Sequence, residues 1–159
     1  KSGKQVFQNG VIKNIIITKC DGKEKLVQLD DLKITPYHPI IEKGENECNW
    51  VYPKDLGIVE DFECSEVYTF ILDNRQSVLI EDYIFVTLGS GLSDNEVVQH
   101  DYFCSERVID DINNINVNKN RKTLLTKDMY QRDRNGDICY IGFEWNLTNI
   151  MKTFFYANL

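Results

Sequence analysis

The chain has 159 residues and a formal net charge of −7, from 25 acidic and 18 basic side chains. This length suits one compact domain, or one domain with an appendage. Hydrophobic residues make up 42% of the sequence and charged residues 27%, a globular mixture that excludes a largely disordered or fibrous chain. The acidic balance argues against a nucleic-acid partner, because binding to a phosphate backbone needs a basic surface.

The apolar runs and the cysteines of the sequence bear on where the protein is found in the cell. No apolar run approaches the roughly 20 residues that span a bilayer, so we expect no membrane span. The five cysteines are widely spaced, odd in number and without a C-x-x-C pair. This pattern favours free thiols over a disulfide framework and predicts a cytoplasmic protein, which we expect to be a monomer. Because the first residue is Lys1 and not Met, we expect a piece of a longer protein.

Turn residues alternate with short apolar segments through the first half of the chain, a pattern typical of a β protein. Alanine, the strongest helix former, occurs only once, as Ala157. We predict a first strand at residues 11–18 and a second at residues 25–29, separated by a turn at Asp21 and Gly22. A further strand is expected at residues 32–35, and a strand end with a tight turn at residues 50–57. Three more strands are expected between residues 66 and 91.

The pattern changes in the second half. Residues 105–115 have apolar side chains at helical spacing and begin with Ser105, a residue type favoured at helix N-caps. Asn135 and Gly136, between two apolar segments, predict a hairpin. The aromatic tail at residues 147–156 is expected to dock on the rest of the protein. We therefore divide the chain into a β core, residues 1–91, and a C-terminal α/β extension packed on it, residues 92–159.

An internal repeat is one explanation for two similar segments. Residues 25–38 can be laid over residues 77–90 at an offset of 52 positions, which aligns Thr35 with Thr87. Apolar positions coincide, but only two residues are identical, so a true repeat and the general likeness of two hairpins fit equally well. If the repeat is real, two similar β units pack about a pseudo-dyad, and the two threonines end equivalent strands.

Thr35 and His38 are the residues whose spacing most directly indicates chemistry. They lie three positions apart at a predicted strand end, beside Pro36 and Pro39, which restrict the backbone. A hydroxyl and an imidazole that meet there could polarise a carbonyl and protonate a leaving nitrogen. On spacing alone, a half-buried histidine that bonds to a loop carbonyl is the more common arrangement.

Four segments in order resemble the Hint (hedgehog/intein) superfamily, and more closely its Vint group, the Hint domains attached to von Willebrand factor A-type proteins. The resemblance covers about residues 11–110. It rests on Thr-Pro-Tyr-His-Pro-Ile at 35–40, Trp-Val-Tyr-Pro-Lys-Asp-Leu at 50–56, Val-Tyr-Thr-Phe-Ile-Leu at 67–72 and Val-Thr-Leu-Gly-Ser-Gly-Leu at 86–92. It implies a β horseshoe built from two pseudo-symmetric halves, with no cofactor.

The resemblance also implies self-processing. In this superfamily an N-terminal cysteine attacks the carbonyl before it and converts the peptide bond into a thioester, which water or another nucleophile, such as a small thiol, then cleaves. Thr35 would hydrogen-bond at the scissile amide, His38 would protonate the departing nitrogen as general acid, and Thr87 would contribute from the second half. The substrate would be the protein's own upstream segment, cleaved in cis.

Three departures from the family pattern qualify this hypothesis. The family nucleophile lies several dozen residues before the threonine, so we expect it upstream of Lys1; Cys20 is too near. Thr87 and Leu88 stand where inteins have a His-Asn pair, and leucine has no amide to cyclise, so we expect cleavage on the N-terminal side without splicing. Ser90 stands where the Vint pattern has a second histidine.

Two alternatives stay open at this point. The first is a degenerate Hint domain that no longer cleaves and acts as a protein-interaction module. The second is a zinc-stabilised module in which His100 and Cys104, at H-x3-C spacing, bind the metal with Cys48 or Cys64. No second pair at ligand spacing exists, so packing roles are the simpler explanation for these residues.

Overall fold

The computed structural model describes residues 9–45, 49–75, 77–93 and 95–143. Within these residues the chain is mainly β, which confirms the predicted fold class and is consistent with a Hint-type β fold. The elements in chain order are β1 (Ile12–Leu29), β2 (Leu32–Ile34), β3 (Ile40–Glu42), the 3-10 helix η1 (Pro53–Asp55), β4 (Val59–Leu72), β5 (Ser77–Ile80), β6 (Tyr83–Val86), α1 (Glu106–Ile115), β7 (Lys122–Leu125), the 3-10 helix η2 (Lys127–Met129), β8 (Tyr130–Arg132) and β9 (Ile138–Ile141).

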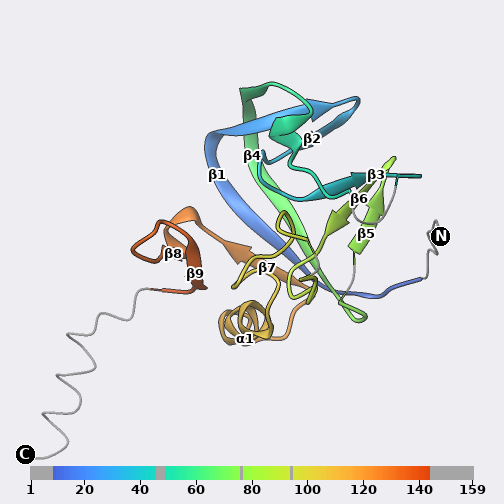
Figure 1. Ribbon diagram of the computed structural model, residues 1–159. Coiled ribbons are helices and arrows are strands. Elements are labelled where there is room, and N and C mark those ends of the chain that lie inside the picture. The colour runs from blue at the N-terminus through green and yellow to red at the C-terminus, as the bar shows by residue number, and fades with distance from the viewer. Residues whose placement is uncertain (1–8, 46–48, 76, 94, 144–159) are drawn as a thin grey trace, which may run out of the picture.

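Two long antiparallel strands, β1 and β4, form a curved ribbon that runs through the molecule (Figure 1). The second edge of β1 is shared: β7 pairs in parallel with its first half, and β2 pairs with its end. The predicted turn at Asp21 and Gly22 was wrong, because β1 continues through both residues. The register shifts between Lys19 and Gly22, and Gly22 has a positive φ of 85°. These turn residues therefore form an irregularity inside a paired strand, of the kind that bends a ribbon without ending it.

The two segments that align in the sequence both form hairpins, one from β1 and β2 and the other from β5 and β6. Their turns begin at Asp30 and Glu81, which have φ values of 51° and 52°. The turns therefore correspond at an offset of 51 positions and not 52. Because β6 has four residues and β2 has three, the offset of 52 holds at the strand ends, where Thr35 and Thr87 follow.

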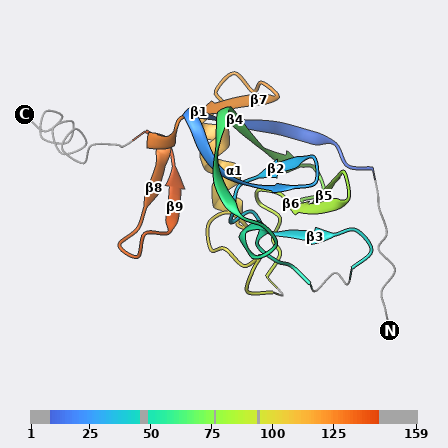
Figure 2. The ribbon, with the colours of Figure 1, turned by 90° about the horizontal axis from the view of Figure 1, so that it is seen from above.

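The residues after β6 pack against the ribbon. Ser105 occupies the predicted N-cap position of α1, but its hydroxyl donates to the carbonyl of Tyr102 at 2.8 Å and makes no capping bond. Strands β8 and β9 form the predicted hairpin, on the opposite side of the ribbon from the β3–β6–β5 sheet (Figure 2). One apolar cluster joins all these parts: Ile16, Ile71, Tyr102, Val108, Ile112, Leu125, Met129, Ile138 and Ile141.

Two further expectations concern the C-terminal part. The aromatic tail at residues 147–156 lies outside the described residues, and the domain division at residue 91 stays a prediction. The described part of the chain contains no helix that is both long enough and apolar enough to cross a membrane.

Two neighbouring leucines of β7 allow a test of how much the apolar cluster that contains Leu125 stabilises the fold. Leu125 is 1% exposed in the apolar cluster, whereas Leu124 is 60% exposed. We expect Leu125→Ala to lower the free energy of unfolding by about 2–5 kcal/mol, because it leaves a cavity in a closed core. Leu124→Ala, the matched control, should change it by less than about 1 kcal/mol. Urea unfolding followed by circular dichroism measures both, and equal effects would contradict the burial of β7.

Candidate functional site

A cavity of about 540 Å³ lies between the β1–β4 ribbon, the end of β6 and the loop at residues 97–104. The three residues predicted as catalytic, Thr35, His38 and Thr87, all line it. A larger cavity of about 780 Å³, beside the start of β1 and the end of α1, is lined by none of them. The structure therefore brings the predicted residues to one place, while their catalytic roles stay a prediction.

Thr35 and His38 stand at the two ends of one turn. The backbone N–H of His38 donates to the carbonyl of Thr35 at 3.3 Å, which closes the chain around Pro36. The carbonyl of Pro36 accepts a bond of 3.2 Å from the N–H of Lys54, so the segment at residues 50–56 is attached to this turn. Main-chain hydrogen bonds thus join two of the motif segments that are separate in the sequence.

The His38 ring is held by the end of β6. Its Nε2 lies 2.8 Å from the carbonyl oxygen of Val86, and its edge packs against the Phe85 ring with centroids 5.7 Å apart. A carbonyl oxygen only accepts, so Nε2 must donate, and the neutral ring has its lone pair on Nδ1. Among the described residues, Nδ1 has no hydrogen-bond partner. The ring therefore bonds to a backbone carbonyl, as spacing alone favoured, but this carbonyl belongs to the last residue of a strand and not to a loop. The lone pair on Nδ1 is not used by this bond.

Burial controls the charge of His38. It lowers the pKa of the ring below its ordinary value, and the hydrogen bond to the Val86 carbonyl opposes this shift only in part. At neutral pH the ring is therefore uncharged, and Nδ1 can take up a proton and then release it.

Thr87 follows β6 and is 3% exposed. The segment around it is fixed on both sides: Leu88 N–H donates to the carbonyl of Phe70 in β4 at 3.0 Å. On the other side, Gly89 N–H donates to the carbonyl of Phe103 at 2.8 Å. Gly89 has a positive φ of 68°, and a Cβ there would come within 2.3 Å of the Ile109 side chain of α1. Glycine is therefore required at this position by both conformation and space.

The lining of the cavity also contains polar pairs that the sequence did not indicate. Lys127 Nζ lies 2.7 Å from a carboxylate oxygen of Glu24, and the hydroxyls of Thr18 and Tyr130 are 2.6 Å apart. Burial would raise the pKa of the Glu24 carboxyl, but the hydrogen bond and charge of Lys127 outweigh it and the pKa is lowered. The partners in each pair are more than a hundred positions apart, so no local pattern could have found them.

Two tyrosines line the cavity beside the turn that contains Thr35 and His38. Tyr37 and Tyr52 pack edge to face with ring centroids 5.8 Å apart, and Lys54 Nζ lies 5.5 Å from both centroids.

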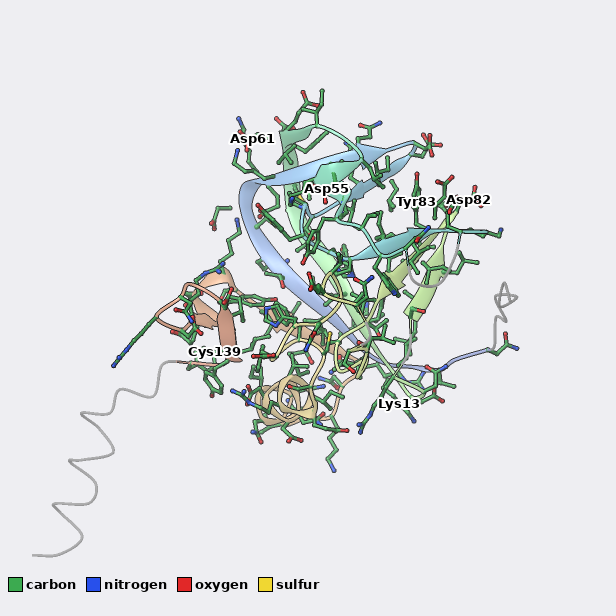
Figure 3. All side chains as sticks on the ribbon, in the orientation of Figure 1. Lys13, Asp55, Asp61, Asp82, Tyr83 and Cys139 are labelled. Atoms are coloured by element: carbon green, nitrogen blue, oxygen red, sulfur yellow. The ribbon has the colours of Figure 1, made fainter. Side chains whose placement is uncertain are left out.

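The acidic side chains Asp61 and Asp82 are elsewhere, on the side of the molecule away from α1 in Figure 3. Their side chains are 61% and 79% exposed, and neither lines the cavity, so this part of the acidic charge faces solvent.

The described cysteines do not form the metal site considered as an alternative. The described residues contain no group of three or more side chains able to hold a metal ion, and Cys48 lies outside them. Cys104 Sγ donates to the carbonyl of Val98 at 2.8 Å, and the backbone N–H groups of Tyr102 and Phe103 donate to Nδ1 of His100. Burial and the neighbouring Cys64 raise the pKa of the Cys20 thiol to about 12, which makes it a poor nucleophile.

Comparison with known families shows which family the chain belongs to. A model of the Vint Hint-domain family matches residues 2–140. The chain therefore belongs to this family and is, in general terms, a Hint/intein-like autoprocessing domain. A search of curated proteins found no match.

The state of His38 can be measured directly. Because burial lowers its pKa, we expect the ring to titrate below about 6.5 in the folded protein. The unfolded state then binds more protons, so the free energy of unfolding should fall as the pH is lowered below about 6.5. The loss should be smaller in His38→Gln, which cannot be protonated. Ring proton NMR and urea unfolding at several pH values check both points, and a midpoint at or above the ordinary value would contradict them.

Proposed function

We propose that this chain is an autoprocessing Hint domain that cleaves the peptide bond on its N-terminal side through an N–S acyl shift and a thioester, without splicing. The observation that supports it best is the convergence of Thr35, His38 and Thr87 on one cavity, with the Nε2 of His38 bonded to a carbonyl so that the lone pair of the neutral ring is on Nδ1. The substrate is the upstream segment of the same protein, and the nucleophile is a cysteine that precedes Lys1, as the family pattern implies.

The lowered pKa of His38 suits it to move one proton. The thiol sulfur bonds to the carbonyl carbon, and its proton goes to Nδ1 of His38. The bond from carbon to nitrogen then breaks, and the imidazolium gives this proton to the departing nitrogen. The step exchanges an amide for a thioester without other reactants, and the thioester is the easier bond to cleave.

Threonine hydroxyls hold the reacting amide in place. In this proposal Thr35, at the other end of the turn that contains His38, hydrogen-bonds at the scissile amide, and Thr87, which follows β6, contributes from the lining of the same cavity. A group fixed in this way lowers the barrier mainly by positioning the reactants. Leu88, next to Thr87, has no amide that could cyclise, which restricts the reaction to the N-terminal side.

The setting of the reaction follows from the composition. Among the described residues Cys20, Cys64, Cys104 and Cys139 are free, which supports a reducing, cytoplasmic compartment. There the thioester would be released by water or by a small thiol. The protein works as a monomer without a cofactor, attached to a von Willebrand factor A-type protein.

The test uses the precursor, with the sequence that precedes Lys1. Wild type should cleave with a rate that dithiothreitol accelerates, since a thiol attacks a thioester. His38→Ala should slow cleavage by about 10²–10⁴-fold, because the departing nitrogen loses its proton donor. Thr35→Val should slow it as well, while Thr35→Ser, the matched control, keeps the hydroxyl and should retain most activity. Intact mass followed over time measures all four proteins.

Two results would contradict this proposal. A wild-type precursor that stays whole with and without thiol would favour the non-cleaving interaction module. Cleavage that persists in His38→Ala would remove the imidazole from the reaction.

A further inference from the structure

We propose that His100 is a second catalytic imidazole, which donates a hydrogen bond to the carbonyl oxygen of the scissile peptide bond. The proposal rests on the cleavage reaction proposed above and adds a residue to it. His100 belongs to the loop between β6 and α1, and it lines the same cavity as Thr35 and His38.

The tautomer of the neutral His100 ring is set by hydrogen bonds from its own loop. Its Nδ1 accepts hydrogen bonds from the backbone N–H groups of Tyr102 and Phe103, both at 3.2 Å. Amide nitrogens only donate, so Nδ1 carries no proton and the neutral ring has its proton on Nε2. Nε2 has no hydrogen-bond partner among the described residues. The ring therefore offers an N–H group and not a lone pair.

The two imidazoles of the cavity therefore differ in the hydrogen-bonding group that each leaves unused. His38 uses its Nε2–H on the Val86 carbonyl and keeps a lone pair on Nδ1, which suits a proton carrier. His100 uses its lone pair on the loop amides and keeps an N–H, which suits a fixed donor. Attack on a carbonyl needs both: a group that moves the thiol proton and a donor for the oxygen that becomes negative.

The loop that bears His100 is held rigidly. The His100 ring packs on the Phe103 ring with centroids 4.6 Å apart, and Phe103 contacts the Tyr102 ring at 5.5 Å. Tyr102 is 1% exposed, and its hydroxyl donates to a carboxylate oxygen of Asp111 in α1 at 2.7 Å. A donor held by such contacts needs little reorganisation when charge develops, which is the condition for effective stabilisation of an oxyanion.

The same loop is bonded to the segment that follows Thr87. Gly89 N–H donates to the Phe103 carbonyl at 2.8 Å, and Gly91 N–H donates to the Cys104 carbonyl at 2.9 Å. Ser90, between these glycines, takes the place of the second histidine of the Vint pattern, and its hydroxyl accepts a bond from Leu92 N–H at 3.4 Å. Main-chain hydrogen bonds therefore join the segment around Ser90, which has no histidine, to the loop that contains His100.

In the proposed step the electrons of the carbonyl double bond move to oxygen as the thiol sulfur bonds to carbon. The Nε2–H of His100 donates to this oxygen while it is negative and keeps its proton throughout. When the bond from carbon to nitrogen breaks, the electrons return and the thioester carbonyl forms. The proton that moves is the one on His38.

Two substitutions at His100 separate its two nitrogens. His100→Asn places a side-chain oxygen where Nδ1 accepts the loop amides, a bond that asparagine commonly makes, and removes the donor. His100→Gln reaches about as far as Nε2 with an N–H group and so keeps a donor. We expect His100→Asn to lower the cleavage rate of the precursor by about 10²-fold or more, as for loss of one oxyanion donor. His100→Gln should lower it less than the asparagine variant does.

The experiment compares wild type, His38→Ala and both His100 variants by intact mass with dithiothreitol, with the thermal unfolding midpoint of each as a folding control. Cleavage by His100→Asn at the wild-type rate would overturn the His100 proposal and leave the proposed function intact. Equal slowing of both His100 variants, with lowered midpoints, would make His100 structural and also overturn it. A wild type that does not cleave removes the proposed function, and the role of His100 with it. Nitrogen-15 NMR of the ring gives a readout independent of cleavage, and a proton on Nδ1 would overturn the proposal.

Discussion

Pairing of β1 with β4 along nearly the whole length of both strands is the interaction on which the other parts depend. A strand has two edges, and β4 occupies one edge of β1 on both sides of the register shift near Gly22. The second edge is left for two short strands, β7 on the first half and β2 at the end. The ribbon therefore holds both the first hairpin, with the turn of Thr35 and His38 after it, and the C-terminal part with α1.

The site is assembled mainly by backbone groups. The carbonyl of Val86 holds the His38 ring, and the amides of Tyr102 and Phe103 hold the His100 ring. Because a carbonyl only accepts and an amide only donates, each contact determines which ring nitrogen bears the proton. Two identical side chains thereby acquire different chemistry. The backbone of the fold, more than the neighbouring side chains, sets what each imidazole can do.

Charge in the cavity is balanced locally. Glu24 and Lys127, whose side chains are 22% and 45% exposed, form an ion pair in the cavity lining, so the carboxylate and the ammonium compensate each other. His38, in the same cavity lining, is kept neutral by burial, which lowers its pKa. A neutral cavity wall suits a reaction that begins from an uncharged thiol and an uncharged amide, because negative charge then develops only where a donor can meet it.

The sequence by itself determined the fold class, the hairpins, α1 and the segment containing Thr35 and His38, because alternation, helical spacing and turn residues act over a few positions. It misjudged Asp21 and Gly22, because turn residues inside a strand bend it when a partner strand pairs on both sides. Only the tertiary structure decided that His100 faces the cavity of His38 and that Glu24 meets Lys127. Those contacts join residues tens of positions or more apart through β1, β6 and β7, and no local pattern encodes which strands will pair.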